Sequence, residues 1–144
     1  MIERRRFLVL GGAVLLPLPG RVARAAPDDV AKAMREIAGE APLQKGRVKL
    51  QIPMLIDNGN AVSITVGVEA PEGARVASLH VFAEGNPLPN VVHAHFGSRA
   101  AKPQLSTRIR LATSQTVIAM AKFADGSCWT DSAETIVTLA ACLE

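Results

Sequence analysis

The chain has 144 residues, which is the usual length of a single domain. Apolar residues make up 49% of it, enough for a hydrophobic core, but aromatic residues make up only 3% and tyrosine is absent. The core must therefore be built mostly from Val, Ile, Leu and Ala. The formal net charge is +3, and its meaning depends on where the basic residues lie.

The first 25 residues have the features of an export signal. The run Arg4-Arg5-Arg6-Phe7-Leu8 precedes a short apolar stretch, and the segment ends in Ala23-Arg24-Ala25. A basic start, an apolar stretch and an A-x-A site are typical of a cleaved signal peptide, and R-R-x-F-L fits the twin-arginine pattern. The apolar stretch is shorter than the roughly 20 residues that span a bilayer. We therefore predict a twin-arginine signal peptide at 1–25 and a periplasmic location for the mature protein. The alternatives are an ordinary secretory signal and an uncleaved membrane anchor.

Removal of this segment changes the charge of the working protein. Residues 1–25 contain five Arg and one Glu, a charge of +4, and subtracting this from +3 leaves −1 for residues 26–144. Nucleic-acid binding requires a basic face, so we expect no nucleic-acid partner, and no membrane association after cleavage. The twin-arginine route carries folded proteins. No cofactor motif follows, so we expect a partner protein rather than a cofactor.

Hydrophobic spacing predicts one helix followed by strands. Residues 28–41 carry apolar residues at helical spacing, with Asp28 as the candidate N-cap and Pro42 as the stop. From Gly46 onward, apolar and polar residues alternate, and the runs are separated by turn signals such as Asp57-Asn58-Gly59-Asn60. The predicted strands lie at 48–52, 62–68, 76–83, 91–96, 105–111, 115–123 and 135–139. About seven short strands at even spacing indicate an all-β, immunoglobulin-like antiparallel sandwich with a short N-terminal helix.

The C-terminus carries the residue best suited to chemistry. The last predicted strand is followed by Ala140-Ala141-Cys142-Leu143-Glu144, so a thiol lies two residues from the end. Chain ends are normally exposed, and a thiolate is a nucleophile and a reversible attachment point for sulfur. Cys142 is therefore a candidate covalent carrier. A small apolar residue packed at the end of the last strand is the alternative interpretation.

Several segments of the chain resemble the SoxY family of sulfur-carrier proteins. They are, in order, residues 80–89, 106–112, 124–127 and 138–142, and the resemblance covers nearly the whole length. It implies an exported protein with an N-terminal helix, an immunoglobulin-like sandwich at 26–144, and a C-terminal arm whose cysteine, here Cys142, holds the intermediates of thiosulfate oxidation. It also implies a heterodimer with a SoxZ-like subunit and encounters with the sulfur-oxidising enzymes of the periplasm.

The arm departs from the pattern of that family. SoxY arms read G-G-C-G-G, whereas this chain has Ala140 and Ala141 before the cysteine and Leu143 and Glu144 after it. Glycine makes an arm slim and supple because it lacks a Cβ, so this arm should be wider and stiffer. The carboxylates of the terminal residue should also raise the pKa of the Cys142 thiol. The chain thus resembles a divergent SoxY branch.

The remaining candidate groups have plainer interpretations. Cys128 is expected to be structural, with a disulfide to Cys142 as the alternative, provided that their Cα atoms lie within about 7 Å. His93 and His95 share one strand face, and with His80 they could ligate a metal; a polar face or an interface is the favoured interpretation, so no metal site is predicted. Asp131 and Glu134 are predicted to be solvated turn residues.

Three functions are therefore compared. The leading hypothesis is a carrier without catalytic residues, in which Cys142 holds a sulfur-containing group for enzymes of the pathway. The alternative is a non-covalent binding or assembly module that pairs with a SoxZ-like partner. The third is a metalloenzyme that uses His80, His93 and His95.

Overall fold

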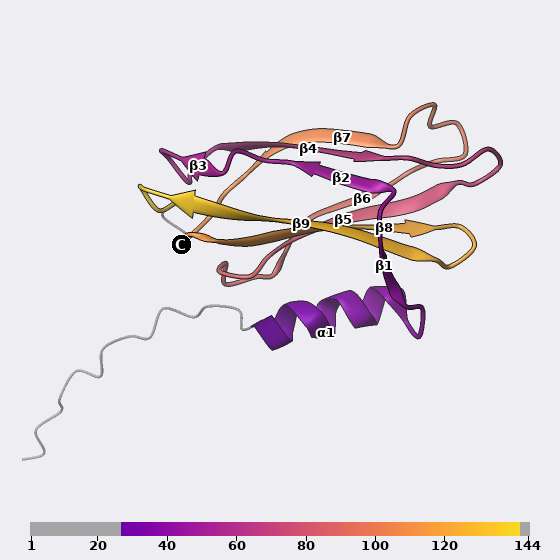
Figure 1. Ribbon diagram of the computed structural model, residues 1–144, viewed down its shortest axis with the longest axis horizontal. Helices are drawn as coiled ribbons and strands as arrows, with labels where there is room; N and C mark the ends of the chain where they lie inside the picture. Colours follow the sequence, from indigo (N-terminus) through magenta and orange to yellow (C-terminus); the bar gives the residue numbers. More distant parts are fainter. Residues whose placement is uncertain (1–26, 142–144) are drawn as a thin grey trace, which may run out of the picture.

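The computed structural model describes residues 27–141, which form two packed β-sheets with one helix on the outside (Figure 1). The larger sheet has six strands in the order β1-β9-β8-β5-β6, with β3 also paired to β9, and the smaller sheet has the order β2-β4-β7. The elements are α1 Pro27–Ala38, β1 Leu43–Lys45, β2 Val48–Gln51, β3 Leu55–Ile56, β4 Val62–Val68, β5 Val76–Ala83, β6 Asn90–His95, β7 Gln104–Ile109, β8 Gln115–Phe123 and β9 Cys128–Val137.

This architecture confirms the predicted all-β, immunoglobulin-like sandwich with a short N-terminal helix. The strands predicted at 62–68, 76–83 and 115–123 have the observed bounds, and those predicted at 91–96 and 105–111 are shifted by one or two residues. Most pairs are antiparallel, as predicted. The exceptions are β1 and β3, which both pair with β9 in the parallel sense and were not predicted.

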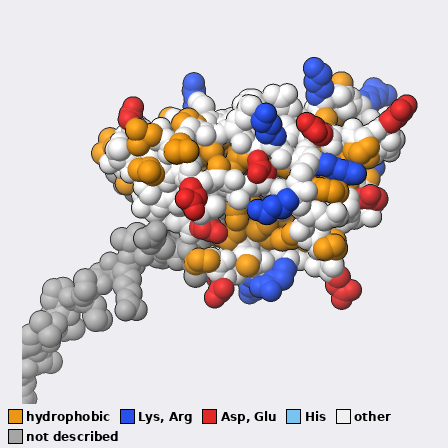
Figure 2. Space-filling model, viewed as in Figure 1, with side chains coloured by type: hydrophobic (Ala, Val, Ile, Leu, Met, Phe, Trp, Pro, Cys, Tyr) orange, Lys and Arg blue, Asp and Glu red, His pale blue; other side chains and the backbone are white. Residues whose placement is uncertain are grey.

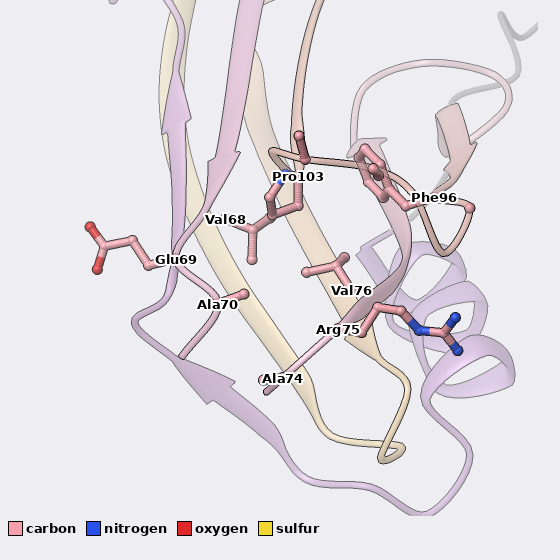
Figure 3. A pocket seen from close by; sticks show the side chains of 11 residues that line it. Val68, Glu69, Ala70, Ala74, Arg75, Val76, Phe96 and Pro103 are labelled. Carbon is pink, nitrogen blue, oxygen red and sulfur yellow. The ribbon is translucent and has the colours of Figure 1, made fainter. Parts of the chain in front are cut away.

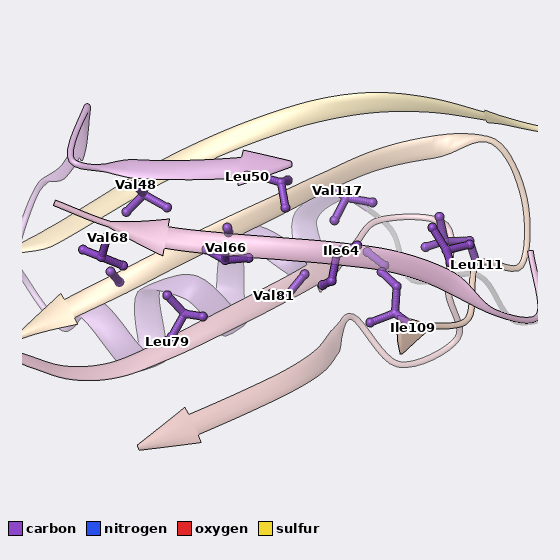
Figure 4. Close-up of a cluster of buried hydrophobic side chains, with 14 of the residues drawn as sticks. Val48, Leu50, Ile64, Val66, Val68, Leu79, Val81, Ile109, Leu111 and Val117 are labelled. Carbon is purple, nitrogen blue, oxygen red and sulfur yellow. The ribbon is translucent and has the colours of Figure 1, made fainter. Parts of the chain in front are cut away.

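The hydrophobic core lies between the two sheets. Buried residues alternate with outward-facing ones along the whole of β4, as the sequence pattern predicts for a strand with one buried face. Because a slip of one residue would expose this face, the alternation fixes the register of the strand. Figure 4 shows the aliphatic side chains of both sheets that meet in this layer: Val48, Leu50, Ile64, Val66, Val68, Leu79, Val81, Ile109, Leu111 and Val117.

Helix α1 covers the outer face of the larger sheet, on the side away from the smaller one (Figure 1). Val30 and Met34 of the helix pack against Phe82 of β5 and Met120 of β8. The Lys122 ammonium of β8 also donates a 2.8 Å hydrogen bond to the Ile37 carbonyl, near the end of the helix. The helix therefore gives this sheet a second, smaller apolar layer.

The ends of the helix differ from the prediction. It begins at Pro27, so Asp28 lies in the first turn and is not the N-cap. Proline suits the first helical position because its φ is already helical and it has no N–H to satisfy. The helix ends at Ala38 and not at residue 41, because Gly39 adopts a φ of 64° and terminates it.

The last strand, β9, is longer than predicted. It begins at Cys128, so the interpretation of Asp131 and Glu134 as turn residues was wrong. Both lie in the middle of a strand that pairs with β8 along most of its length, where polar and buried residues alternate. The Asp131 carboxylate accepts a 2.8 Å hydrogen bond from the Leu50 N–H of β2, so β9 also ties the two sheets together.

The connection between β2 and β4 is not the tight hairpin predicted at residues 57–60. The two strands are antiparallel neighbours, but the chain between them first forms β3, which pairs with the end of β9. Residues 57–60 then reverse the chain, with the Asn58 side-chain oxygen accepting a hydrogen bond from the Asn60 N–H. As a result, Gly59 lies beside the C-terminal segment.

Some predictions fall outside the described residues. These are the signal peptide at 1–25, the carrier Cys142, and the arm residues Leu143 and Glu144. Within residues 27–141, no helix is both long enough and apolar enough to cross a membrane.

Candidate functional site

The segment that leads to Cys142 is fastened to one end of the sandwich. After β9 ends at Val137, the Thr138 N–H donates to the Ile56 carbonyl (2.9 Å), and its hydroxyl donates to the Asp57 carbonyl (3.0 Å). Three residues later, the Ala141 N–H donates to the Leu111 carbonyl (3.1 Å). The chain is therefore held by hydrogen bonds up to the residue before the candidate carrier.

Gly59 is the residue that lets these segments approach one another. Its N–H donates to the Leu139 carbonyl (2.8 Å), and its carbonyl accepts from the Leu111 N–H (2.9 Å). A Cβ at this position would collide with the Leu111 carbonyl oxygen and would lie 3.0 Å from the Ala141 backbone nitrogen. Since backbone atoms cannot move aside cheaply, the anchoring of the C-terminal segment requires glycine here.

The loop that carries Leu111 is itself held by a buried side chain, Asn86, in the turn between β5 and β6. The Asn86 amide nitrogen donates to the Arg110 carbonyl (2.8 Å), and its oxygen accepts from the Ala112 N–H (3.0 Å). Gln115 donates to the same oxygen (3.1 Å) and accepts from the Gly85 N–H (2.7 Å). Asn86 and Gln115 thus position the carbonyl that anchors Ala141.

The two arm residues that the structure describes behave differently. Ala140 is exposed, whereas Ala141 is only 9% exposed. Consecutive Cα atoms are about 3.8 Å apart, and the sulfur of a cysteine is two bonds from its Cα. Because Ala141 is held, covalent geometry limits how far a side chain at the following residue can extend from the sandwich.

Cys128 lies at the other end of β9. Its side chain is fully buried, its thiol is free, and burial raises its pKa. It pairs with Leu43 of β1, about 30 Å along β9 from Val137 at a strand rise of about 3.3 Å per residue. These features match the structural role predicted for it. The disulfide with Cys142 involves a residue outside the described part of the chain and stays a prediction, which the length of β9 disfavours.

The three histidines are brought together on the outer face of the larger sheet. His80 of β5 lies opposite His93 of β6 with ring centroids 4.3 Å apart, and His95 follows at 4.4 Å from His93. The His80 Nε2 atom is 3.1 Å from the Ser78 hydroxyl oxygen, and its buried Nδ1 atom has no hydrogen-bond partner. Within residues 27–141, no group of three or more His, Cys, Asp or Glu side chains is arranged to hold a metal ion.

This cluster predicts a specific dependence of stability on pH. Burial, followed by the charges of His93, His95 and Lys122, lowers the pKa of His80 from 6.5 to about 4. Below pH 6.5 the unfolded chain therefore binds a proton that the folded chain does not. At about 1.4 kcal/mol per pKa unit, the free energy of unfolding should fall by up to about 3 kcal/mol between pH 6.5 and pH 4.

Urea unfolding of the mature protein at several pH values between 7 and 4 tests this. The His80→Gln variant should lose most of the dependence. The variant His95→Gln, altered at an exposed ring of the same cluster, should keep most of it, because burial is the largest cause of the lowered His80 pKa. Equal pH dependence in the wild type and His80→Gln would show that another group is responsible.

A cavity lies at the opposite end of the sandwich from Ala141. It has a volume of about 520 Å³ and opens where β4 ends and β5 begins. Its lining includes Glu69 and Arg75 beside apolar residues such as Val68 and Val76. Figure 3 shows that the side chains of Glu69 and Arg75 point in opposite directions. The cavity has no convergent polar groups, so it is a poor candidate for a reaction site.

The sequence predicts Cys142 as the reactive residue, but it does not reveal the residues that hold the segment before it. The sequence predicts only a hairpin turn at Gly59 and the start of a strand at Gln115. Asn86 lies in the Gly85-Asn86-Pro87 turn and within one of the segments that resemble SoxY. A buried polar residue in a turn could have been suspected there, but no local signal reveals that it holds residues 110–112.

Solved structures with similar folds support this architecture. The sulfur carrier protein SoxY from Chlorobium limicola f thiosulfatophilum superposes with a TM-score of 0.67 at 23% identity, covering 78% of this chain and 98% of that one. A superoxide reductase (neelaredoxin) from Ignicoccus hospitalis gives a TM-score of 0.53 at 17% identity, over 80% of this chain and 95% of that one. At these identities, the two likenesses establish the fold alone.

The family is established by sequence. No curated protein gives a significant sequence match to the chain. A family model described as "Sulfur oxidation protein SoxY" matches residues 34–142, which is most of the chain and includes Cys142 at its last position. The match runs through the histidine strands, the Asn86 turn and the anchored C-terminal segment. This chain therefore belongs to the SoxY family.

Proposed function

We propose that this protein is a periplasmic sulfur carrier that holds sulfur-containing intermediates covalently on Cys142. The observation that carries the proposal is the match to the SoxY family up to residue 142. The anchoring of Ala141 at one open end of the sandwich supports it, because a thiol next to that residue can be presented to another protein while the fold stays intact.

The chemistry needs only the thiolate. Attack of the Cys142 sulfur on a disulfide-like sulfur forms a new S–S bond and releases the other sulfur as a thiolate, so the number of electrons is conserved. The reverse attack by an acceptor thiolate unloads the carrier. The enzymes of the pathway supply any oxidation or hydrolysis, and this chain supplies the attachment point. We accordingly assign it no catalytic residue.

The proposal includes a location and partners. The signal predicted at residues 1–25 would send the folded protein to the periplasm by the twin-arginine route. A SoxZ-like subunit would form a heterodimer with it and be exported with it, and sulfur-oxidising enzymes would load and unload Cys142. These expectations follow from membership of the family and from the signal pattern.

One observation favours a second function. Ala141 is buried and bonded where the family pattern has a supple glycine, which shortens the arm. A short arm suits a non-covalent assembly module, in which the C-terminal segment is a docking tail. In that case Cys142 would carry no adduct.

Intact mass spectrometry of the mature protein from its native periplasm separates the two functions. The carrier should show added mass in sulfur-sized or thiosulfonate-sized increments on Cys142, removed by dithiothreitol and absent from Cys142→Ser. After removal of the adduct by dithiothreitol, the mass should correspond to a chain that begins at Ala26, as cleavage of the predicted signal peptide requires. An unmodified thiol during active sulfur metabolism would reject the carrier function and favour the assembly module.

A further inference from the structure

Exposed apolar side chains gather at the end of the sandwich where the described chain ends. Met54 is 75% exposed, Leu55 61%, Ile136 55% and Leu139 60%. These four residues, which we call the apolar patch, lie on β3 and on the end of β9 with the segment after it. Figure 2 shows hydrophobic side chains collected over these elements, at the left of the view. Adjoining exposed apolar residues, unlike single scattered ones, commonly mark an interaction site.

The members of the patch are held side by side by backbone pairing. Leu55 is the register partner of Ile136 in the parallel pairing of β3 with β9, so the two side chains share a face. The Ile136 N–H also donates to the Met54 carbonyl (2.8 Å), and the Leu139 carbonyl accepts from the Gly59 N–H. The patch is thus a fixed feature of the fold.

The distribution of exposed apolar residues is strongly one-sided. Among the described residues, six large apolar side chains are exposed, and the patch accounts for four of them. A fifth, Leu88, lies in the turn between β5 and β6, at the same end as Ala141. The sixth, Leu43, pairs with Cys128 at the opposite end of β9. A general tolerance of surface apolar residues would not concentrate them around one end.

The closeness of the patch to Ala141 indicates which kind of protein covers the patch. Leu139 is two residues from Ala141, no more than about 7 Å along the chain, and Cys142 follows Ala141 directly. A stable protein contact covers about 800 Å² of each partner, a disc of roughly 16 Å radius. A contact of this size that is centred on the residue after Ala141 therefore lies over at least part of the patch.

We propose that the apolar patch is the docking surface of the enzyme that loads or unloads Cys142. That enzyme presents an apolar rim around a reactive group close to its own surface, because the anchored segment cannot deliver the thiol into a deep channel. The inference rests on the carrier function proposed above and adds the chemistry of the partner. A SoxZ-like subunit or a second copy of this chain on the patch are the competing occupants.

The test uses the mature protein loaded with its sulfur adduct and periplasmic extract of the source bacterium as the unloading agent. The double variant Leu55→Asn/Ile136→Thr changes the patch, and Leu43→Asn is the matched control at the far end of the same sheet. We expect adduct loss, followed by intact mass, to be at least about tenfold slower in the patch variant and unchanged in the control. Unloading by dithiothreitol should be equally fast in all three.

The possible outcomes distinguish the proposed docking surface from its alternatives. Unloading by the extract at the wild-type rate would overturn the patch as the docking surface. Loss of a co-purifying subunit, or of a dimer, from the patch variant would assign the patch to that stable interface and would also overturn it. Failure of the wild type to carry any adduct would reject the carrier function itself. If the double variant unfolds, Leu139→Ser, also in the patch, replaces it.

Discussion

Replacing Cys142 with serine is expected to abolish sulfur loading and all sulfur-compound oxidation that depends on this protein. A serine hydroxyl at neutral pH is a poor nucleophile, and it cannot form or exchange an S–S bond. The effect should be complete, because the chain has only one other cysteine and that side chain is buried in the core. Two measurements check this. One is the mass of the adduct on the protein, and the other is the rate of sulfur-compound oxidation when the wild type or the variant is added to an extract that lacks the native protein.

Cys128→Ala is the control for that experiment. It removes the second thiol at the cost of a small cavity, so loading should persist while stability falls by about 1–2 kcal/mol. If the serine variant at residue 142 supported normal oxidation, the C-terminal segment would be a docking tail. If the Cys128 variant also lost loading, the two thiols would be needed together, which would favour the Cys128–Cys142 disulfide.

Asn86→Ala is expected to lower the free energy of unfolding by about 3 kcal/mol. The side chain is 5% exposed and satisfies the Arg110 carbonyl and the Ala112 N–H, and both would lose their partner in a buried setting. A buried polar group left unsatisfied costs about 1–3 kcal/mol. Because the same loop carries the carbonyl that holds Ala141, alkylation of Cys142 by iodoacetamide should also become faster.

Asn60→Ala is the matched control, since its amide bonds only to the nearby Asn58 at the surface. Chemical denaturation should place this variant within about 0.5 kcal/mol of the wild type. A loss of less than 1 kcal/mol in Asn86→Ala would mean that water replaces the side chain, and that the anchoring of residue 141 does not depend on it.

The sequence predicted the fold well where the signal was local. Alternation along residues 62–68 reports a strand with one buried face, and that is what β4 is. The pattern failed for β1 and β3, because strands of three and two residues are too short for a period of two to appear. It also failed for Asp131, whose carboxylate is recruited by β2 from 81 residues away.

Of the candidate site, the sequence predicts only the cysteine that we propose as the reactive residue. A cysteine near the end of the chain and a resemblance to a known arm pointed to Cys142. The surroundings depend on contacts between residues far apart in the chain, such as Gly59 with Leu111 and Ala141. No window of sequence contains such a contact. The substitution of alanine for glycine at residue 141 was expected to stiffen the arm, whereas the structure adds that this residue is fastened to the body.

The fastening of Ala141 has a consequence for the way in which cargo could travel. A long tether would let one carrier body remain in place while its thiol visits two enzymes in turn. If Cys142 carries the cargo, fastening at Ala141 ties the movement of the thiol to that of the whole protein, and each transfer then requires release from one enzyme and diffusion to the next. Association between proteins commonly proceeds at about 10⁵–10⁷ M⁻¹s⁻¹. Flux through such a carrier would therefore depend on its concentration in the compartment as much as on the enzymes that it serves.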